Sequence, residues 1–477
     1  MWRRTAAACC VAAGIGLATA SVATAKPTPL PAAATATASR PDTCPAAAQG
    51  RRIGAIRYTG LNATRPFVVD RARFQQLGHR FSCARYRLEE ARLQGLDLFA
   101  VIRVTTTPMP QDQLAVTYHF LELPKYIVFP AVRRSDVYGW LVGPAVSFLN
   151  FLGRDIRLEA FLRSAVAPKP FVATELLFEA SSPWIGRAVP VEYAMRVLRN
   201  QAFDAVKLFN ESSWNARLSF FHRMTWRFRL IYAAEFTQVS PDPLNPTFDL
   251  ASNPTPVPVV LNNQGDLVLG LSAGVLWDSR DRRVNPHSGL RFEATVGQYG
   301  GVLGGPANYQ RVLFDHRSWL HVRWTPSQLT ILHLSALARL RPGRMGVYDY
   351  YVVGGPNSLR SVAQSSELYG QSEVLGTAEL RHELFDRRPF SLFGFHLYAG
   401  LQVVAGGDVA LLWRPQDALN GPPRVASAVY GGLHVLLPGV DRVRFELGWH
   451  RDAQGRWQSG FSVGLFEKSR TQRLRHR

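Results

Sequence analysis

Beyond its N-terminus, the sequence contains no uninterrupted apolar run of the roughly 18–20 residues that a membrane-spanning helix requires. Nevertheless 47% of its 477 residues are hydrophobic. They are spread over short stretches in which apolar and polar residues alternate. In lipid every backbone polar group must be paired, and only helices and closed barrels achieve this. The lack of helical runs therefore predicts a β protein whose strands form a transmembrane barrel.

Cysteine is scarce, and its placement excludes several kinds of site. Of four cysteines, Cys9 and Cys10 lie in the apolar N-terminus, and the remainder keeps only Cys44 and Cys83. No C-x-x-C occurs, so neither a zinc site nor a redox motif is supported. In an oxidising compartment the pair predicts a disulfide, with two unpaired thiols as the alternative. The apolar stretch before Cys9 is too short for a lipoprotein signal.

Acidic residues are outnumbered, with 55 Lys and Arg against 35 Asp and Glu and a net charge of +20. There is no basic helix, no zinc finger and no stripe of alternating basic and aromatic residues, so a nucleic-acid partner is not expected. Arginines alternate with apolar residues along the predicted strands. This pattern places them on the water-filled side of a barrel wall.

The N-terminus has the marks of export. Residues 1–25 predict a signal peptide, with basic Arg3 and Arg4, a small-residue apolar region and an A-x-A cleavage signal ending at Ala25. A short membrane anchor is the alternative. Residues 26–50 are rich in Ala, Pro and Thr without periodicity and predict a flexible linker.

Residues 51–124 predict one small α+β domain. Thr64 can cap a helix that contains Pro66 in its first turn and that ends at Gly78. The predicted order is β-α-α-β-β, with the elements at 52–58, 64–77, 86–96, 99–104 and 114–121.

Residues 125–466 predict an antiparallel barrel. In segments 226–236, 330–340 and 442–449, apolar residues on one face alternate with Arg, His, Ser or Glu on the other. Lipid-facing and lumen-facing positions alternate in this way in outer-membrane barrels. About 340 residues at ~10 residues per strand suggest about 16 strands, with 14 or 18 left open. A soluble β-sandwich is the alternative fold.

Short motifs make the resemblance specific. The first unit is similar to a polypeptide-transport-associated (POTRA) domain in residues 56–62, at Gly78, in 98–104 and in 121–124. The barrel resembles the BamA/TamA-like bacterial surface antigen superfamily. The matching segments are 150–158 (an N-x-x-G-R strand), 182–184, 277–289, 354–360, 376–381 and 405–408. A single POTRA-like domain is expected, where relatives usually carry several.

The resemblance implies a loop that folds into the lumen from outside. Its motif residues are Gly354, Gly355, Leu359 and Arg360. By analogy Arg360 pairs with a carboxylate on the barrel wall, for which Asp408 is the expected partner, and a solvated loop arginine is the alternative. Glu379 and Arg381 are expected in the same lumen charge network. Ser361 and Val362 stand where the family usually has Gly followed by Phe or Tyr.

A hairpin motif comprises Asp278, Arg280, Asp281, Pro286 and Gly289. We interpret it as a charged hairpin that lines the barrel, with a metal or catalytic cluster as the alternative.

A G-x-S-x-G motif surrounds Ser272. The nucleophile elbow requires a strand, a turn and a helix, whereas Ser272 falls inside the continuous predicted strand 266–276. A barrel lipase is therefore disfavoured. No catalytic residue, metal or cofactor is expected.

The resemblance implies a protein of the bacterial outer membrane, with its N-terminal domain in the periplasm, that assists insertion or translocation of proteins. Its expected partners are the outer-membrane bilayer, unfolded outer-membrane or secreted clients, and periplasmic or lipoprotein components. A passive pore or structural barrel is the alternative. Residues 467–477 predict a basic tail that either is solvated or binds anionic headgroups.

Overall fold

A computed structural model describes most of the chain from Cys44 to Gly464. The described segments are 44, 46–96, 98–135, 139–166, 174–185, 191–204, 209–241, 260–262, 264–282, 285–322, 329–355, 358–362, 368–392, 395–413, 423–437, 442–451 and 456–464. The predicted signal peptide, residues 26–43 of the predicted linker and the basic tail lie outside these residues. The linker prediction is wrong for residues 46–50, because η1 (Ala46–Ala48) lies there and Ala48 packs in the core of the α+β domain. Within them, no helix is both long and apolar enough to cross a bilayer.

The N-terminal α+β domain has the predicted order of elements. Its strands are β1 (Arg52–Thr59), β2 (Phe99–Met109) and β3 (Gln113–Glu122), and its helices are α1 (Pro66–Ala72) and α2 (Cys83–Gln94). The sheet order is β1-β3-β2, in which β1 and β3 are parallel. A hydrophobic core formed by both helices and the sheet includes Val69, Leu93 and Tyr118. Cys44 and Cys83 are joined by a disulfide.

Helix α1 is shorter than predicted. Pro66 occupies its first turn, but its N-cap residue is Arg65 rather than Thr64, and the helix ends at Ala72. The carboxylate of Glu89 accepts hydrogen bonds from the backbone N–H groups of Phe74 at 2.5 Å and of Gln75 at 2.7 Å. A helix would have used those groups internally, so this tertiary acceptor competes with a further turn.

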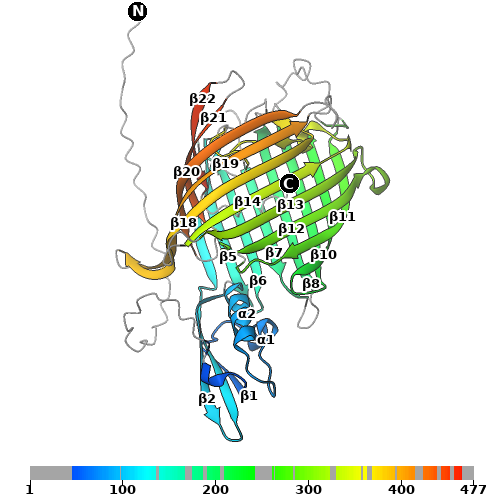
Figure 1. Cartoon of the computed structure of the whole chain (residues 1–477). Helices are drawn as coiled ribbons and strands as arrows, with labels where there is room; N and C mark the ends of the chain where they lie inside the picture. The colour runs from blue at the N-terminus through cyan, green and yellow to red at the C-terminus, as the bar shows by residue number, and fades with distance from the viewer. Residues whose placement is uncertain are drawn as a thin grey trace, which may run out of the picture. The chain divides into compact units, whose positions relative to one another are not determined.

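The second compact part is a large antiparallel sheet that closes on itself (Figure 1). Its first strands are β4 (Tyr126–Ser135), β5 (Gly139–Phe151), β6 (Ile156–Ala165), β7 (Thr174–Ser182), β8 (Val191–Asp204), β9 (Phe209–Arg223), β10 (Phe228–Pro241) and β11 (Asp266–Asp278). They are followed by β12 (Gly289–Gly300), β13 (Asn308–Val322), β14 (Leu329–Leu340), β18 (Ser372–Leu392), β19 (Phe395–Trp413), β20 (Arg424–Leu436), β21 (Val443–Arg451) and β22 (Trp457–Gly464).

These 16 long strands of the described residues follow the chain order, and β22 returns to β4. The two-residue strand β15 (Gly343–Arg344) adds to β13 near β14. The predicted barrel is therefore confirmed at the strand count favoured from the sequence. We call the end where β4 begins, at Tyr126, the proximal end, and the opposite end the distal end.

The strands alternate as predicted. On β21, Phe445, Leu447 and Trp449 are exposed, whereas Arg444 and Glu446 are buried inside. The same alternation on β10 exposes Tyr232 and places Glu235 in an internal ion pair with Arg311. An apolar outer face with a charged interior is the arrangement of a barrel that faces lipid.

The family-like segment 150–158 is not one strand as predicted. It is the end of β5, a turn and the start of β6, because Leu152, Gly153 and Asp155 have positive φ values of 57°, 70° and 59°. Side-chain and backbone groups of this turn contact the α+β domain. Asn150 donates to Thr64 at 2.8 Å, and the backbone N–H of Arg65 donates to the Gly153 carbonyl at 3.0 Å.

Candidate functional site

A long connection between β14 and β18 forms the candidate site. It leaves the wall at the distal end, and includes η4 (Val347–Asp349) and the small hairpin of β16 (Tyr351–Val352) and β17 (Tyr369–Gly370). Gly354 and Gly355 then turn the chain with φ values of 131° and 78°, which glycine adopts without steric cost. The hydroxyl of Ser358 bridges this turn by donating to the Gly354 carbonyl and accepting from the Gly354 N–H, both at 2.7 Å.

Arg360 lies at the tip of this connection and pairs with Asp408 on β19. Its Nε–H and one terminal N–H donate to the two carboxylate oxygens at 3.0 and 3.1 Å, and its backbone N–H donates at 3.2 Å. Thr377 donates to the same carboxylate at 2.7 Å. Both members of the pair are buried. A bidentate Arg–carboxylate pair is strong and fixes orientation as well as charge.

Two further carboxylates surround the guanidinium. Glu379 on β18 pairs with Arg360 and also with Arg381. Glu446 on β21 lies 3.3 Å from the same Arg360 nitrogen. The ring of Tyr430 on β20 stacks against the guanidinium, with its centroid 3.7 Å from Cζ. Four consecutive strands, β18 to β21, thus contact one loop arginine at mid-depth in the wall.

The sequence indicated Asp408, Glu379 and Arg381 but missed Glu446, Thr377 and Tyr430 as members of this cluster. Glu446 carried a usable signal, because its alternation with Phe445 and Leu447 predicted that it faces the lumen. Its distance to the loop could not be read from that alternation.

Ser361 keeps the tight turn that the family usually forms with glycine. Its φ is +74°, a left-handed value that a residue with a side chain adopts only with strain. Two glycines of the last strands make room for it. A Cβ atom on Gly448 would lie 2.7 Å from the Ser361 Cβ, and one on Gly460 would lie 2.1 Å from the Ser361 carbonyl oxygen. These glycines face each other across β21 and β22.

The side chains on either side of this tip bury it in an apolar cluster. Leu359 is fully buried, and Val362 packs in the same cluster, together with Leu337 of β14 and Leu375 of β18. Val362 thus fills an apolar site where the family usually has an aromatic residue. The loop is therefore attached to the wall by apolar packing as well as by charge.

The hairpin motif forms the turn between β11 and β12 at the proximal end. Asp278 and Arg280 make a bidentate pair, with both contacts at 2.8 Å. Asp281 accepts from the backbone N–H groups of His287 and Ser288 at 3.0 and 3.2 Å, which closes the turn. Gly289 has φ +111°, and a Cβ there would lie 2.5 Å from the Ser279 carbonyl oxygen.

The same turn contacts the wall on its other side, which the sequence did not indicate. Pro286 is buried, and its neighbour Asn285 donates to Glu383 of β18 at 2.7 Å. His287 lies 2.9 Å from the same Glu383 oxygen, and the side chain of Gln402 on β19 donates to the side-chain amide oxygen of Asn285 at 3.0 Å. These contacts join the turn to β18 and β19, which suits a structural role for the turn.

Glu379, His434 and Glu446 are the described group whose geometry suits a cation, with candidate ligand atoms within 4.8 Å of one another. Arg360 already contacts both carboxylates, and His434 contacts Glu446 at 2.9 Å. A metal ion would have to displace the guanidinium, so this cluster carries no metal assignment.

Ser272 lies inside β11, where it pairs with Ala233 and Gly297 on the neighbouring strands. It therefore lacks the strand-turn-helix setting of a nucleophile elbow.

Comparison with known proteins fits this architecture. The Omp85 superfamily domain matches residues 169–466. CdiB from Escherichia coli is similar with a TM-score of 0.57 and 13% identity, over 87% of this chain and 76% of that one. BamA from Haemophilus ducreyi lacking POTRA domains 1–3 has a TM-score of 0.51 and 14% identity, over 87% of this chain and 85% of that one. CdiB from Acinetobacter baumannii has a TM-score of 0.52 and 11% identity, over 87% of this chain and 74% of that one. No curated protein sequence matches significantly.

Proposed function

Because this chain belongs to the Omp85 superfamily, whose members handle client proteins at the outer membrane, we propose that it assists the insertion or translocation of proteins there. The observation that carries the proposal is the seating of Arg360. One loop residue contacts carboxylates on β18, β19 and β21 and holds the loop inside the barrel. No covalent chemistry and no cofactor are part of this function.

The loop tip lies next to the place where the barrel closes. Ser361 packs on the paired Gly448 and Gly460 of β21 and β22, and β22 is the strand that meets β4. β22 and β4 contain eight and ten residues, so the closing pair is short. We propose that this seam opens toward lipid when a client strand is inserted, and that the seated loop stabilises the closed state.

The α+β domain offers one free sheet edge. On β1, the backbone of residues 78–81 covers the start of the strand through three hydrogen bonds, including Gly78 N–H to the Ile53 carbonyl at 2.8 Å. Among the described residues, β2 pairs only with β3. We propose that the domain lies in the periplasm and that an extended client segment adds to β2, by the strand addition that sheet edges permit.

Depletion of the protein tests the proposal as a whole. Outer membranes from depleted cells should lose other barrel proteins, or one secreted client should fail to reach the surface. Wild-type protein should restore them, and Arg360→Ala should not. Unchanged composition of the outer membrane and the secreted fraction after depletion would refute the proposal.

Proline substitution tests the role of β2. Successive N–H groups of an edge strand point to opposite sides. Of the two variants Val104→Pro and Thr105→Pro, one therefore removes a hydrogen bond to β3, and the other, the outward variant, removes a donor from the free edge. The outward variant should keep the domain folded and lose cross-linking to an unfolded barrel-protein peptide. Equal cross-linking by that variant and by the wild type would exclude strand addition at β2.

A passive pore or structural barrel is the second candidate. It would give steady single-channel conductance after reconstitution, with no effect of the protein on client insertion into the same vesicles. The seated loop argues against it, because Arg360 and its carboxylates occupy the lumen side of the wall at mid-depth.

A further inference from the structure

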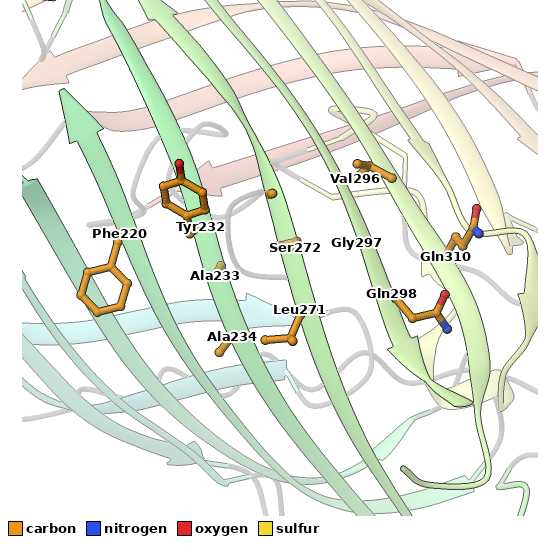
Figure 2. A pocket seen from close by; sticks show the side chains of 11 residues that line it. Phe220, Tyr232, Ala233, Ala234, Leu271, Ser272, Val296, Gly297, Gln298 and Gln310 are labelled. Carbon is orange, nitrogen blue, oxygen red and sulfur yellow. The ribbon is translucent and has the colours of Figure 1, made fainter. Parts of the chain in front are cut away.

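The outer face of the barrel carries a hollow of about 600 Å³ over strands β9 to β13. Figure 2 shows the labelled residues spread over these neighbouring strands. The lining residues are Phe220, Tyr232, Ala233, Ala234, Leu271, Ser272, Ala273, Val296, Gly297, Gln298 and Gln310. The volume lies within the range of about 300–1,000 Å³ that is usual for ligand sites.

The hollow opens to the lipid side of the wall. Tyr232, Leu271 and Val296 are 46%, 55% and 56% exposed, whereas Ala233 and Leu276, which alternate with them, are 6% and 0% exposed. Exposed residues at these alternate positions face the hydrocarbon in a barrel of this family. Whatever fills the hollow must therefore come from the bilayer.

Strand register explains why the wall is hollow here. Along one row across the strands, Ala273 stands between Tyr232 of β10 and Val296 of β12. In the next row toward the distal end, Ala234 pairs with Leu271. The two alanines are diagonal neighbours, so their small side chains leave a slot between the larger side chains of Tyr232, Leu271 and Val296.

The distal end of the slot is polar. Gln298 and Gln310 pair across β12 and β13, two residues before β12 ends at Gly300. Gln298 donates to Asn308 at 2.9 Å, while the Gln310 side chain is exposed and makes no hydrogen bond to the described residues. A lipid-facing carboxamide without a partner is costly. The acyl linkage of a lipid, with its carbonyl and hydroxyl oxygens, is the partner available at that depth.

A cation stands above this polar end. Arg344 of β15 is exposed and pairs along the backbone with Asn308, the residue that contacts Gln298. Toward the distal end, the slot is thus followed by the two carboxamides and then by Arg344. This is the order in which a bilayer lipid presents its acyl chain, its acyl linkage and its phosphate.

We infer that this hollow binds one acyl chain of the phosphorylated glycolipid of the outer leaflet, with Gln310 at its acyl linkage and Arg344 at its phosphate. The choice of leaflet rests on the proposed periplasmic position of the α+β domain. That domain directly precedes the start of β4 at the proximal end, so the distal end is at the cell surface. Lipid A is the phosphate-bearing lipid of that leaflet. Binding to the purified barrel does not involve client insertion, so a negative result here leaves the proposed function untouched.

Native mass spectrometry of the full-length protein in mild detergent, titrated with purified diphosphorylated lipid A, tests the inference. Ala273→Phe fills the slot and should weaken binding of one lipid A equivalent at least tenfold. Ala405→Phe places the same ring at an exposed outward position of β19 and should bind as the wild type does. In unheated samples on a gel, both variants should keep the mobility of a folded barrel. This control separates loss of binding from loss of folding.

Two further arms identify the contacts. Gln310→Leu should weaken lipid A about tenfold, the effect of one lost hydrogen bond in a dry setting. Arg344→Ala should weaken diphosphorylated lipid A and leave dephosphorylated lipid A unchanged. Phosphatidylethanolamine should bind without saturation at this site. Wild-type binding by Ala273→Phe, or equal binding of phosphatidylethanolamine and lipid A, would overturn the assignment.

Discussion

Replacing Arg360 by alanine should destabilise the folded barrel strongly. The guanidinium is buried, and its removal leaves Asp408, Glu379 and Glu446 without their shared cation. Breaking a buried ion pair by deleting one partner typically costs about 3–5 kcal/mol. We expect Arg360→Ala to lower the free energy of unfolding by that amount. Arg360→Lys keeps the charge without the bidentate geometry and should lose about 1.5–3 kcal/mol.

Urea titration of the protein in detergent micelles, followed by tryptophan fluorescence, measures these differences, and the gel mobility of unheated samples reports the folded barrel. A double-mutant cycle with Asp408→Ala isolates the pair and should give a coupling of about 1–3 kcal/mol. The exposed Arg344→Ala is the matched control and should stay within about 0.5 kcal/mol of the wild type. If Arg360→Ala also stayed within that margin and kept its band shift, the seated loop would be unimportant for the fold.

Three further predictions concern other parts of the chain. Ser361→Gly should raise the free energy of unfolding by about 1 kcal/mol because glycine relieves the positive φ, whereas Ser361→Val should lower it; urea titration gives the sign. Burial raises the pKa of the Glu89 carboxyl above the ordinary glutamate value, although hydrogen bonds to it, including one from the Tyr118 hydroxyl, act to lower the pKa. Stability of the isolated α+β domain should therefore fall as pH rises from the ordinary value through the folded-state pKa, and Glu89→Gln should remove this fall in unfolding titrations. Cys83→Ser should lower the Tm of that domain, because opening a disulfide between residues 39 apart costs about 3–4 kcal/mol; an unchanged Tm on calorimetry would contradict this.

Alternation made the barrel predictable from the sequence, since a period of two fixes which residues face lipid and which face the lumen. The alternation of Phe445, Glu446 and Leu447 is an example, and the structure follows it. The Arg360 contact was predictable only through the resemblance of its loop. Nothing local in the sequence brings residue 360 next to residue 408.

The differences arise where tertiary groups override local signals. Helical spacing of Phe74 and Leu77 predicted a longer first helix, but the Glu89 carboxylate takes the N–H groups that the next turn needed. The strand predicted over 150–158 is broken by three residues in the left-handed region. A positive φ leaves little trace in a sequence when residues such as Leu152 adopt it. The contacts of Asn285 with Glu383 were missed for a similar reason, because they join residues 98 apart.

The position of the loop on Gly448 and Gly460 has a consequence for the order of folding. Arg360 precedes in the chain every wall carboxylate that receives it, from Glu379 to Glu446, so these are all made after it. The tip can settle only after the last hairpin has formed, because that hairpin provides the surface on which Ser361 rests. Contacts between residues so distant in sequence form slowly. Seating of the loop is therefore a late event, and it marks the moment at which the newly made barrel is complete.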